Sequence, residues 1–167
     1  MLKTGRAGLA SRAGHDLTLE VTRWSAEVRV PDEEAGGVAA ATVKADLDLG
    51  SLEVRSGAGG AKPLSDRDRA DIKKQISGIL GAGPASFVSS KIVRFGASGG
   101  AIEGTLTFNE QSEPVRLQVS EAGPGRYRGS ATVVQTALGI KPYVGFFGAL
   151  KLKDEVGVEF EVNLPVG

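Results

Sequence analysis

The segment EVGVEFEVNL, residues 155–164, alternates between apolar residues and glutamate, glycine or asparagine. Successive side chains of an extended backbone point to opposite faces, so its valines, phenylalanine and leucine share one side. This period of two predicts a β-strand with one buried face and one face in water.

The same alternation recurs upstream. It predicts strands over residues 43–49, 102–108, 115–120 and 126–133. Turn signals separate the last three: an Asn-Glu-Gln-Ser-Glu-Pro run at 109–114, which suggests a hairpin, and Gly-Pro-Gly at 123–125.

A longer strand is expected from Leu17 to Val30. Its apolar residues change phase between Val21 and Trp24, which requires a bulge near Thr22-Arg23 or two separate segments; we favour one long, bent strand. Weaker patterns at residues 2–8 and 87–95 bring the expected number of strands to about eight.

Residues 64–80 break the pattern. Ile72, Ile76, Ile79 and Leu80 recur at helical spacing, and Ser65 with Asp68 resembles a capping box. An all-β chain of short-turned antiparallel strands with one inserted α-helix predicts a closed barrel or a sandwich, built as a single domain over 1–167.

Composition excludes several function classes. Twenty basic and twenty acidic residues give no net charge, and no basic stripe is present, so nucleic acid is not an expected partner. The absence of cysteine excludes disulfides and thiol catalysis. No cofactor or metal is expected, because one histidine with scattered carboxylates makes a poor metal site. No signal peptide or membrane-spanning segment is visible, which predicts a cytoplasmic protein.

His15 is the only candidate for acid–base chemistry. No Gly-x-Ser-x-Gly motif supplies a nucleophile for it, so a structural hydrogen bond is the favoured interpretation. One alternative places His15 at the mouth of a binding site. Another makes the chain a hydrolase or isomerase that uses His15 on an apolar substrate; we expect no enzyme.

The interior decides between a carrier and a solid barrel. An eight-stranded barrel is either filled by side chains or just wide enough for a small ligand. The predicted inner faces carry small residues at Ala45, Gly104, Gly129 and Ala131, which leave a cavity unless larger neighbours fill the space. A filled-barrel structural or interaction protein therefore stays an alternative.

Residues 139–148 concentrate aromatic side chains between glycines. Phe146 and Phe147 are expected either to form an apolar lid or to plug one end of the barrel. Lys141 and Tyr143 could bind a polar or anionic head group there, or simply extend into solvent.

Four segments together resemble the YceI-like family of polyisoprenoid-binding proteins. They are Gly-His-Asp-Leu at 14–17, the strand 43–52, Gly-Thr-Leu-Thr-Phe at 104–108 followed by Pro114-Val115, and Leu-Gly-Ile-Lys-Pro-Tyr at 138–143. The resemblance implies an extended antiparallel eight-stranded lipocalin-like barrel whose apolar tunnel takes a long isoprenoid or acyl chain. The turn at 110–114 departs from the family pattern, being more acidic and lacking a glycine.

The combined hypothesis is binding, storage or transport of an isoprenoid or fatty-acyl lipid in the barrel, with a homodimer left open. We expect inward side chains to line the tunnel: Leu19, Val43, Leu47, Leu106, Phe108, Val133, Phe146, Phe147 and Phe160. His15, Lys141 and Tyr143 are expected at its mouth.

Overall fold

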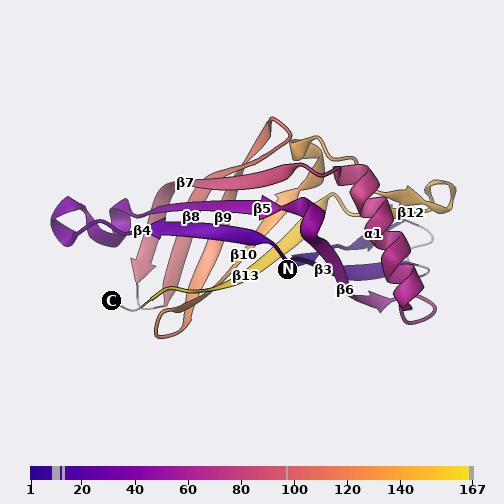
Figure 1. Ribbon diagram of the computed structural model, residues 1–167, viewed down its shortest axis with the longest axis horizontal. Coiled ribbons are helices and arrows are strands. Elements are labelled where there is room, and N and C mark those ends of the chain that lie inside the picture. The colour runs from indigo at the N-terminus through magenta and orange to yellow at the C-terminus, as the bar shows by residue number, and fades with distance from the viewer. Residues whose placement is uncertain (9–11, 13, 97, 166–167) are drawn as a thin grey trace.

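The computed structural model describes residues 1–8, 12, 14–96 and 98–165, except the side chains of Arg94, Phe95 and Phe146. Most of this part of the chain is β-structure (Figure 1). The strands are β1 Leu2–Lys3, β2 Arg6–Ala7, β3 His15–Val21, β4 Trp24–Arg29, β5 Thr42–Asp48, β6 Leu52–Gly59, β7 Pro84–Gly96, β8 Gly99–Phe108, β9 Gln111–Gly123, β10 Arg126–Val134, β11 Val144–Gly145, β12 Leu150–Leu152 and β13 Glu155–Asn163. The helix α1 spans Asp66–Leu80, and short 3-10 helices lie at Glu33–Ala35, Gly37–Ala40, Leu49–Ser51, Gln135–Leu138 and Phe146–Gly148.

Among the described residues, one antiparallel sheet holds ten strands in the order β4-β5-β7-β8-β9-β10-β13-β1-β3-β6. The sheet is strongly curled, so that β4 and β5 lie in front of β8 and β9 (Figure 1). The all-β class and the single long helix are as expected from the sequence, whereas a count of eight strands is not confirmed.

Two pairs of strands in this sheet are continuous bent strands. β3 and β4 are separated only by Thr22 and Arg23, where the Thr22 N–H donates to the Ser51 carbonyl at 3.3 Å and the Asp48 N–H donates to the Arg23 carbonyl at 3.0 Å. β5 continues into β6 through the 3-10 helix at Leu49–Ser51. The phase change read in the sequence at Thr22-Arg23 is therefore confirmed, and each bent strand is counted twice in the sheet.

The helix begins and ends close to its predicted limits. The Asp68 N–H donates to Ser65 Oγ at 3.2 Å, and the Ser65 N–H donates to an Asp68 carboxylate oxygen at 2.8 Å, which completes the capping box. Its apolar side chains Ile72, Ile76 and Leu80 pack on the buried cluster of β3 and β6, and an ion pair joins Lys73 to Glu53 of β6.

The β8–β9 hairpin is tighter than predicted. Asn109 and Glu110, with φ of 45° and 65°, form the turn, and Phe108 already pairs with Gln111. The expected turn through Pro114 was therefore too long. Pro114 is tolerated in the strand, pairing with Thr105, because β9 pairs with β10 only in the stretch that ends at Gln118 opposite Ser130.

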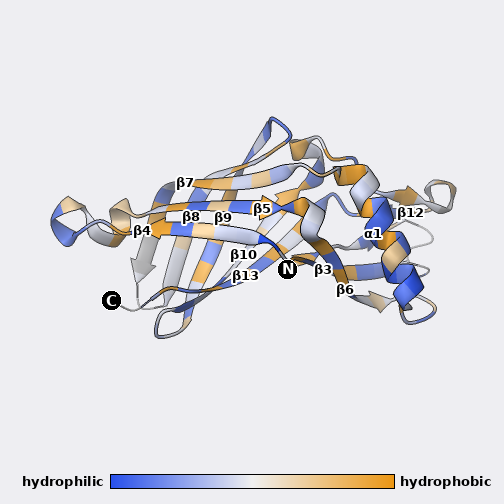
Figure 2. Ribbon diagram, viewed as in Figure 1, coloured by the Kyte–Doolittle hydropathy of each residue, from blue (hydrophilic) through white to orange (hydrophobic). Residues whose placement is uncertain are grey.

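Apolar residues alternate with polar ones along the strands (Figure 2). Many of the apolar side chains line the inside of the curled sheet. The buried residues form three clusters: one around Leu19 and Leu52 beneath α1, one around Phe87, Ile102 and Val119, and one around Ala85, Phe108 and Leu138. These clusters cover parts of the inner wall and leave its middle unfilled.

Candidate ligand cavity

The curled sheet encloses a cavity of about 1180 Å³. This exceeds the ~300–1,000 Å³ usual for small-molecule sites. Its lining is mostly aliphatic and aromatic and comes from the inner faces of β3 to β10 and β13, with Ile76, Ile79 and Leu80 added by α1. The described side chains therefore do not fill the interior of the sheet.

Most residues expected to line the tunnel do so. The cavity wall includes Leu19, Val43, Leu47, Leu106, Phe108, Val133, Phe160 and Tyr143. The alternation could place these side chains correctly because a period of two leaves only two choices of face, and the apolar one is inside.

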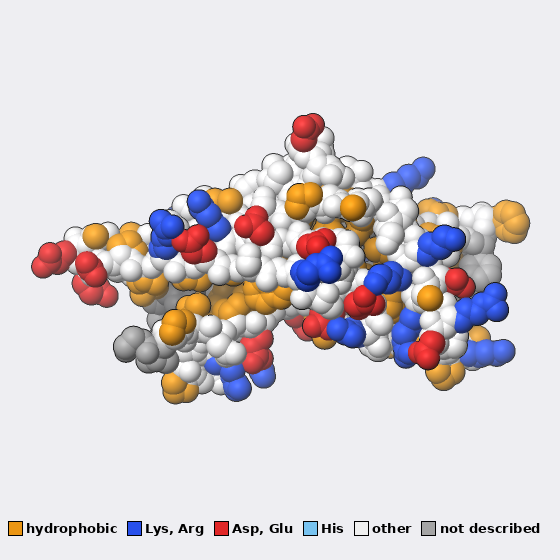
Figure 3. Space-filling model, viewed as in Figure 1, with side chains coloured by type: hydrophobic (Ala, Val, Ile, Leu, Met, Phe, Trp, Pro, Cys, Tyr) orange, Lys and Arg blue, Asp and Glu red, His pale blue; other side chains and the backbone are white. Residues whose placement is uncertain are grey.

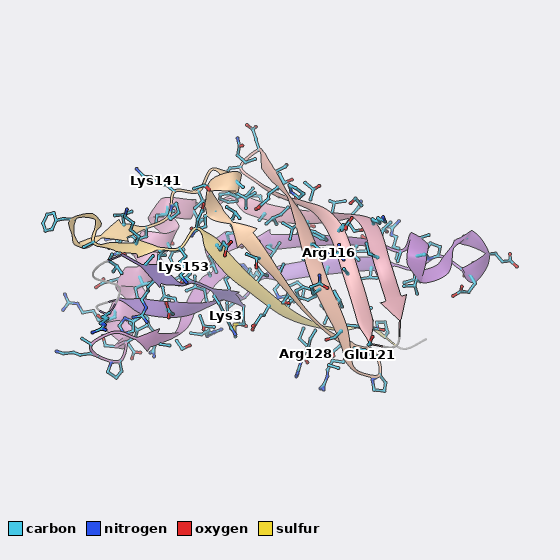
Figure 4. The ribbon with its side chains drawn as sticks, turned by 180° about the vertical axis from the view of Figure 1, so that it is seen from behind. Lys3, Arg116, Glu121, Arg128, Lys141 and Lys153 are labelled. Atoms are coloured by element: carbon cyan, nitrogen blue, oxygen red, sulfur yellow. The ribbon has the colours of Figure 1, made fainter. Side chains whose placement is uncertain are left out.

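Of the predicted site residues, Phe147, Lys141 and His15 lie outside the cavity wall, and the side chain of Phe146 is not among those described. Phe147 was expected inside, but it has a φ of 54° and its side chain is fully exposed on the loop between β11 and β12. Lys141 projects outward from the same end of the molecule (Figure 4) and is not part of the wall. The side chain of Phe146 lies outside the described residues, so the prediction for it stays a prediction.

His15 makes a structural contact. Its Nε2 lies 2.7 Å from the carbonyl oxygen of Lys62, and its ring lies against Gly60, where any Cβ would overlap it. The imidazole ties β3 to the loop before α1 and is not part of the cavity wall. This geometry gives the ring no access to a molecule in the cavity.

Among its described side chains, segment 139–148 contributes only Ile140 and Tyr143 to the cavity wall. β12 pairs with β11 on one side and with β2 on the other in a small separate sheet, and the Leu152 N–H donates to the Tyr143 carbonyl at 3.0 Å. Tyr143 and Ile140 reach the wall at this end of the cavity. The end is closed by the buried cluster of Ala85, Phe108 and Leu138 together with Leu80 of α1.

The small inward residues fall into two groups. A Cβ on Gly104 would overlap the Phe87 ring, and one on Gly129 would overlap the Phe160 ring, so each aromatic side chain lies over a glycine. Ala45 and Ala131 instead border the cavity directly. A large neighbour therefore fills the space beside the two glycines, whereas the space beside the two alanines is part of the cavity.

One side of the cavity is open. Among the residues that the structure describes, β4 pairs only with β5, and the end of β13 pairs only with β10. We call the space between Trp24–Arg29 of β4 and Glu159–Asn163 of β13 the lateral groove. Trp24 on the groove is 43% exposed, and Val30 and Val38, which follow β4 in the chain, are 54% and 44% exposed, although all three line the cavity. Figure 3 shows hydrophobic side chains at the bottom of a hollow below the position of β4.

The alternation of apolar and polar residues does not predict that these three side chains are exposed. The alternation through Trp24, Ala26, Val28 and Val30 predicts an inward face, which the structure confirms. Whether a strand has a neighbour on each side depends on pairings between distant segments, which periodicity does not report.

The charges beside the groove are paired with each other. Lys3 Nζ lies 2.8 Å from a Glu159 carboxylate oxygen, and Arg128 Nε lies 2.8 Å from one of Glu161. The hydrogen bond from Arg128 holds the pKa of Glu161 below its ordinary value. Figure 4 shows Lys3 and Arg128 along this margin of the molecule.

Other kinds of site find little support in the described chain. No group of three or more His, Asp or Glu side chains there is placed to hold a metal ion. No helix in that part is both long and apolar enough to cross a bilayer.

Comparison with known proteins identifies the fold. No curated protein matches the sequence. BcnA of Burkholderia cenocepacia superposes with a TM-score of 0.62 at 20% identity, over 96% of this chain and 94% of that one. The YCEI protein of Campylobacter jejuni superposes with a TM-score of 0.56 at 12% identity, over 88% and 83%. The family model of the YceI-like domain matches residues 9–164, and the chain therefore belongs to the YceI-like family.

Proposed function

We propose that this protein binds a long apolar lipid of isoprenoid or fatty-acyl type within the curled sheet, for storage or transport. The observation that carries the proposal is the cavity of about 1180 Å³ with its mostly apolar wall. Family membership supports it, because the YceI-like family is associated with polyisoprenoid binding.

Burial of the lipid chain supplies the affinity. Removing apolar surface from water is worth roughly 25 cal/mol per Å², so burying on the order of 400 Å² gives about 10 kcal/mol before association costs. Charges in the wall would oppose this, because an unpaired charge in an apolar cavity costs more than the burial gains. The charged groups that border the opening, Arg128, Glu159 and Glu161, are exposed and held in ion pairs, Glu159 with Lys3 and Glu161 with Arg128.

Extraction with organic solvent followed by mass spectrometry tests the proposal directly. The protein purified from cells should yield one lipid class in a near-stoichiometric amount. Protein stripped of lipid should then bind a polyene fatty acid and a prenyl alcohol in competition with each other. Stripped, folded protein that binds neither probe would contradict the proposal.

A matched pair of variants locates the site. Ala131 borders the cavity, whereas Thr132 lies on the opposite, outer face of β10. Ala131→Leu should weaken binding of the polyene probe by roughly 10-fold or more by taking space from the ligand. Thr132→Leu should leave it unchanged, and equal effects of the two would place the lipid elsewhere.

The His15 hypothesis has its own control. Since the ring contacts Lys62 and Gly60 and not the cavity, His15→Gln should leave lipid affinity unchanged. An activity on an apolar ester or alkene that disappears in this variant would support the enzyme alternative instead.

A further inference from the structure

The lateral groove begins, at its inner end, as a gap of one strand in the sheet. There β1 lies between β3 and β13, with Leu2 opposite both Leu19 and Val158. Neighbouring strands lie about 4.8 Å apart, so β3 and β13 are separated there by roughly 10 Å. No other strand of the described residues lies on the track of β1, and the edges of β4 and of the end of β13 that face the groove have no described partner.

The hydrogen-bonding groups on the β4 edge can be assigned. Asp48 donates its N–H to Arg23, and Val43 donates its N–H to Ser89 on the other side of β5. Alternate residues of an antiparallel strand point their N–H and C=O groups to opposite sides. Ser25, Glu27 and Arg29 therefore face β5, while Trp24, Ala26 and Val28 point theirs into the groove.

The β13 edge presents a matching row. The Glu159 N–H donates to the Met1 carbonyl at 2.8 Å, which is the bond that an antiparallel neighbour makes. By the same alternation, Glu161 and Asn163 point their backbone groups into the groove, while Phe160 and Val162 face β10. β4 and β13 run in the same direction, because each of β3 and β13 is antiparallel to β1. A single strand can therefore be antiparallel to both.

Side chains in the groove specify what such a strand would carry. Its inward side would meet Trp24, Ala26 and Phe160, which are apolar and line the cavity. Its outward side would meet Glu159 and Glu161, two carboxylates that already pair with cations, Lys3 and Arg128, each at 2.8 Å.

We propose that the lateral groove accepts an extended peptide strand from a partner, antiparallel to β4 and β13, with alternating apolar and cationic or hydroxyl side chains. Continuity with β1 favours a strand as the occupant, because β1 already fills the first part of the same track. The added strand gains backbone hydrogen bonds on both sides, which is how peptides bind exposed sheet edges. It also closes the cavity wall, so that a lipid inside would exchange more slowly.

Trp24 is a built-in probe, because it is the only tryptophan and lies on the groove. The test uses the full chain, stripped of lipid, and the peptide acetyl-Thr-Val-Lys-Val-Thr-Val-Lys-amide. Saturable binding should shift Trp24 emission to the blue as the peptide covers the indole. A peptide of the same composition with its valines adjacent should not, because its apolar residues cannot all face inward.

Proline variants separate groove binding from other effects. Ala26→Pro removes an N–H that faces the groove and leaves the β4–β5 ladder intact, so the protein should stay folded while peptide affinity falls roughly 10-fold or more. Glu27→Pro is the contrasting variant, since its N–H faces β5 and its loss should lower the melting temperature.

Three outcomes would overturn the proposal. The first is folded Ala26→Pro that binds the peptide as well as the wild type, and the second is wild type that shows no saturable shift. The third is a shift that grows with protein concentration alone and accompanies a dimer in sedimentation, which would assign the groove to a second copy. None of these outcomes depends on lipid affinity, which the polyene probe measures separately.

Discussion

At the scale of single residues, the Phe160 ring is positioned by the absence of a side chain at Gly129. A Cβ there would overlap the ring, and Phe160 and Gly129 are direct partners between β13 and β10. Gly129→Ala should therefore push Phe160 into the cavity, lowering stability by about 1–3 kcal/mol and weakening lipid binding. Denaturant unfolding and probe titration check both effects. Gly157→Ala on β13 is the control, because its Cβ would make only ordinary contacts, with Lys3 Cβ at 3.7 Å and the Lys3 carbonyl oxygen at 3.8 Å.

Glu110 occupies a backbone conformation that favours glycine. With φ of 65° it is the second residue of the two-residue turn joining β8 to β9, a position where asparagine-glycine is the preferred pair. Glu110→Gly should raise the free energy of unfolding by about 0.5–1 kcal/mol, since relief of the left-handed strain exceeds the added entropy of the unfolded chain. Urea midpoints measure this change, and a lower midpoint would contradict the turn assignment.

The side chains that lie in the cavity wall as expected are those whose position required only a choice between the two faces of a strand. Val43, Leu106 and Phe160 were placed correctly because each lies inside a regular strand. Phe147 does not line the cavity. It lies in a loop that contains several glycines, where no sequence period predicts the direction of a side chain. The contact of His15 with Lys62 joins residues that are far apart in sequence, and local pattern does not report it.

At the scale of elements, α1 depends on its capping box. Ser65→Ala removes the hydroxyl that accepts the Asp68 N–H and should cost about 1 kcal/mol of stability. Hydrogen exchange in the first turn of the helix should increase more than exchange in β8. A uniform loss of protection throughout the sheet would mean that the helix does not unfold independently.

The same box predicts a pH dependence. Hydrogen bonds from Ser65, first from its side chain and then from its backbone, hold the pKa of Asp68 below its ordinary value of 3.8. A carboxylate with a lowered pKa stabilises the fold above its ordinary pKa, and this contribution is lost as the pH falls through the lowered value. The stability difference between wild type and Asp68→Asn should be constant from pH 7 to about 5 and shrink below about pH 4. Thermal unfolding at each pH measures this stability difference. A difference that grows at low pH would contradict the prediction.

The strands and the helix could be predicted because each type of element has its own period of apolar residues. The number of strands and the turns between them could be predicted less well. The bent strand at Thr22-Arg23 was visible as a phase change. The predicted β8–β9 turn was too long. The second of its two residues is Glu110 and not glycine, so the usual Asn-Gly signal of a two-residue turn is missing.

At the scale of the whole molecule, the open side of the curled sheet was beyond reach from the sequence. Alternation shows that β4 has an apolar face, but a closed and an open wall share that pattern. Which edges remain free is set by pairings such as β1 with β13, at opposite ends of the chain.

An open sheet around an apolar cavity makes stability depend on the ligand. Without lipid the wall residues keep their contacts on one side only, so the native state gains free energy from any occupant that the unfolded chain does not bind. At a free lipid concentration of 100 times Kd the gain is about 2.7 kcal/mol, which for a domain of this size raises Tm by roughly 5–10 °C. Stripping the purified protein should lower Tm by that amount, and adding prenyl alcohol or fatty acid should restore it with a logarithmic dependence on concentration. Ala131→Leu should show a smaller rise at the same lipid concentration, because it takes space from the occupant. If the Tm of the wild type did not change with lipid, the lipid would not bind in the cavity, or it would bind the unfolded chain as well as the native state.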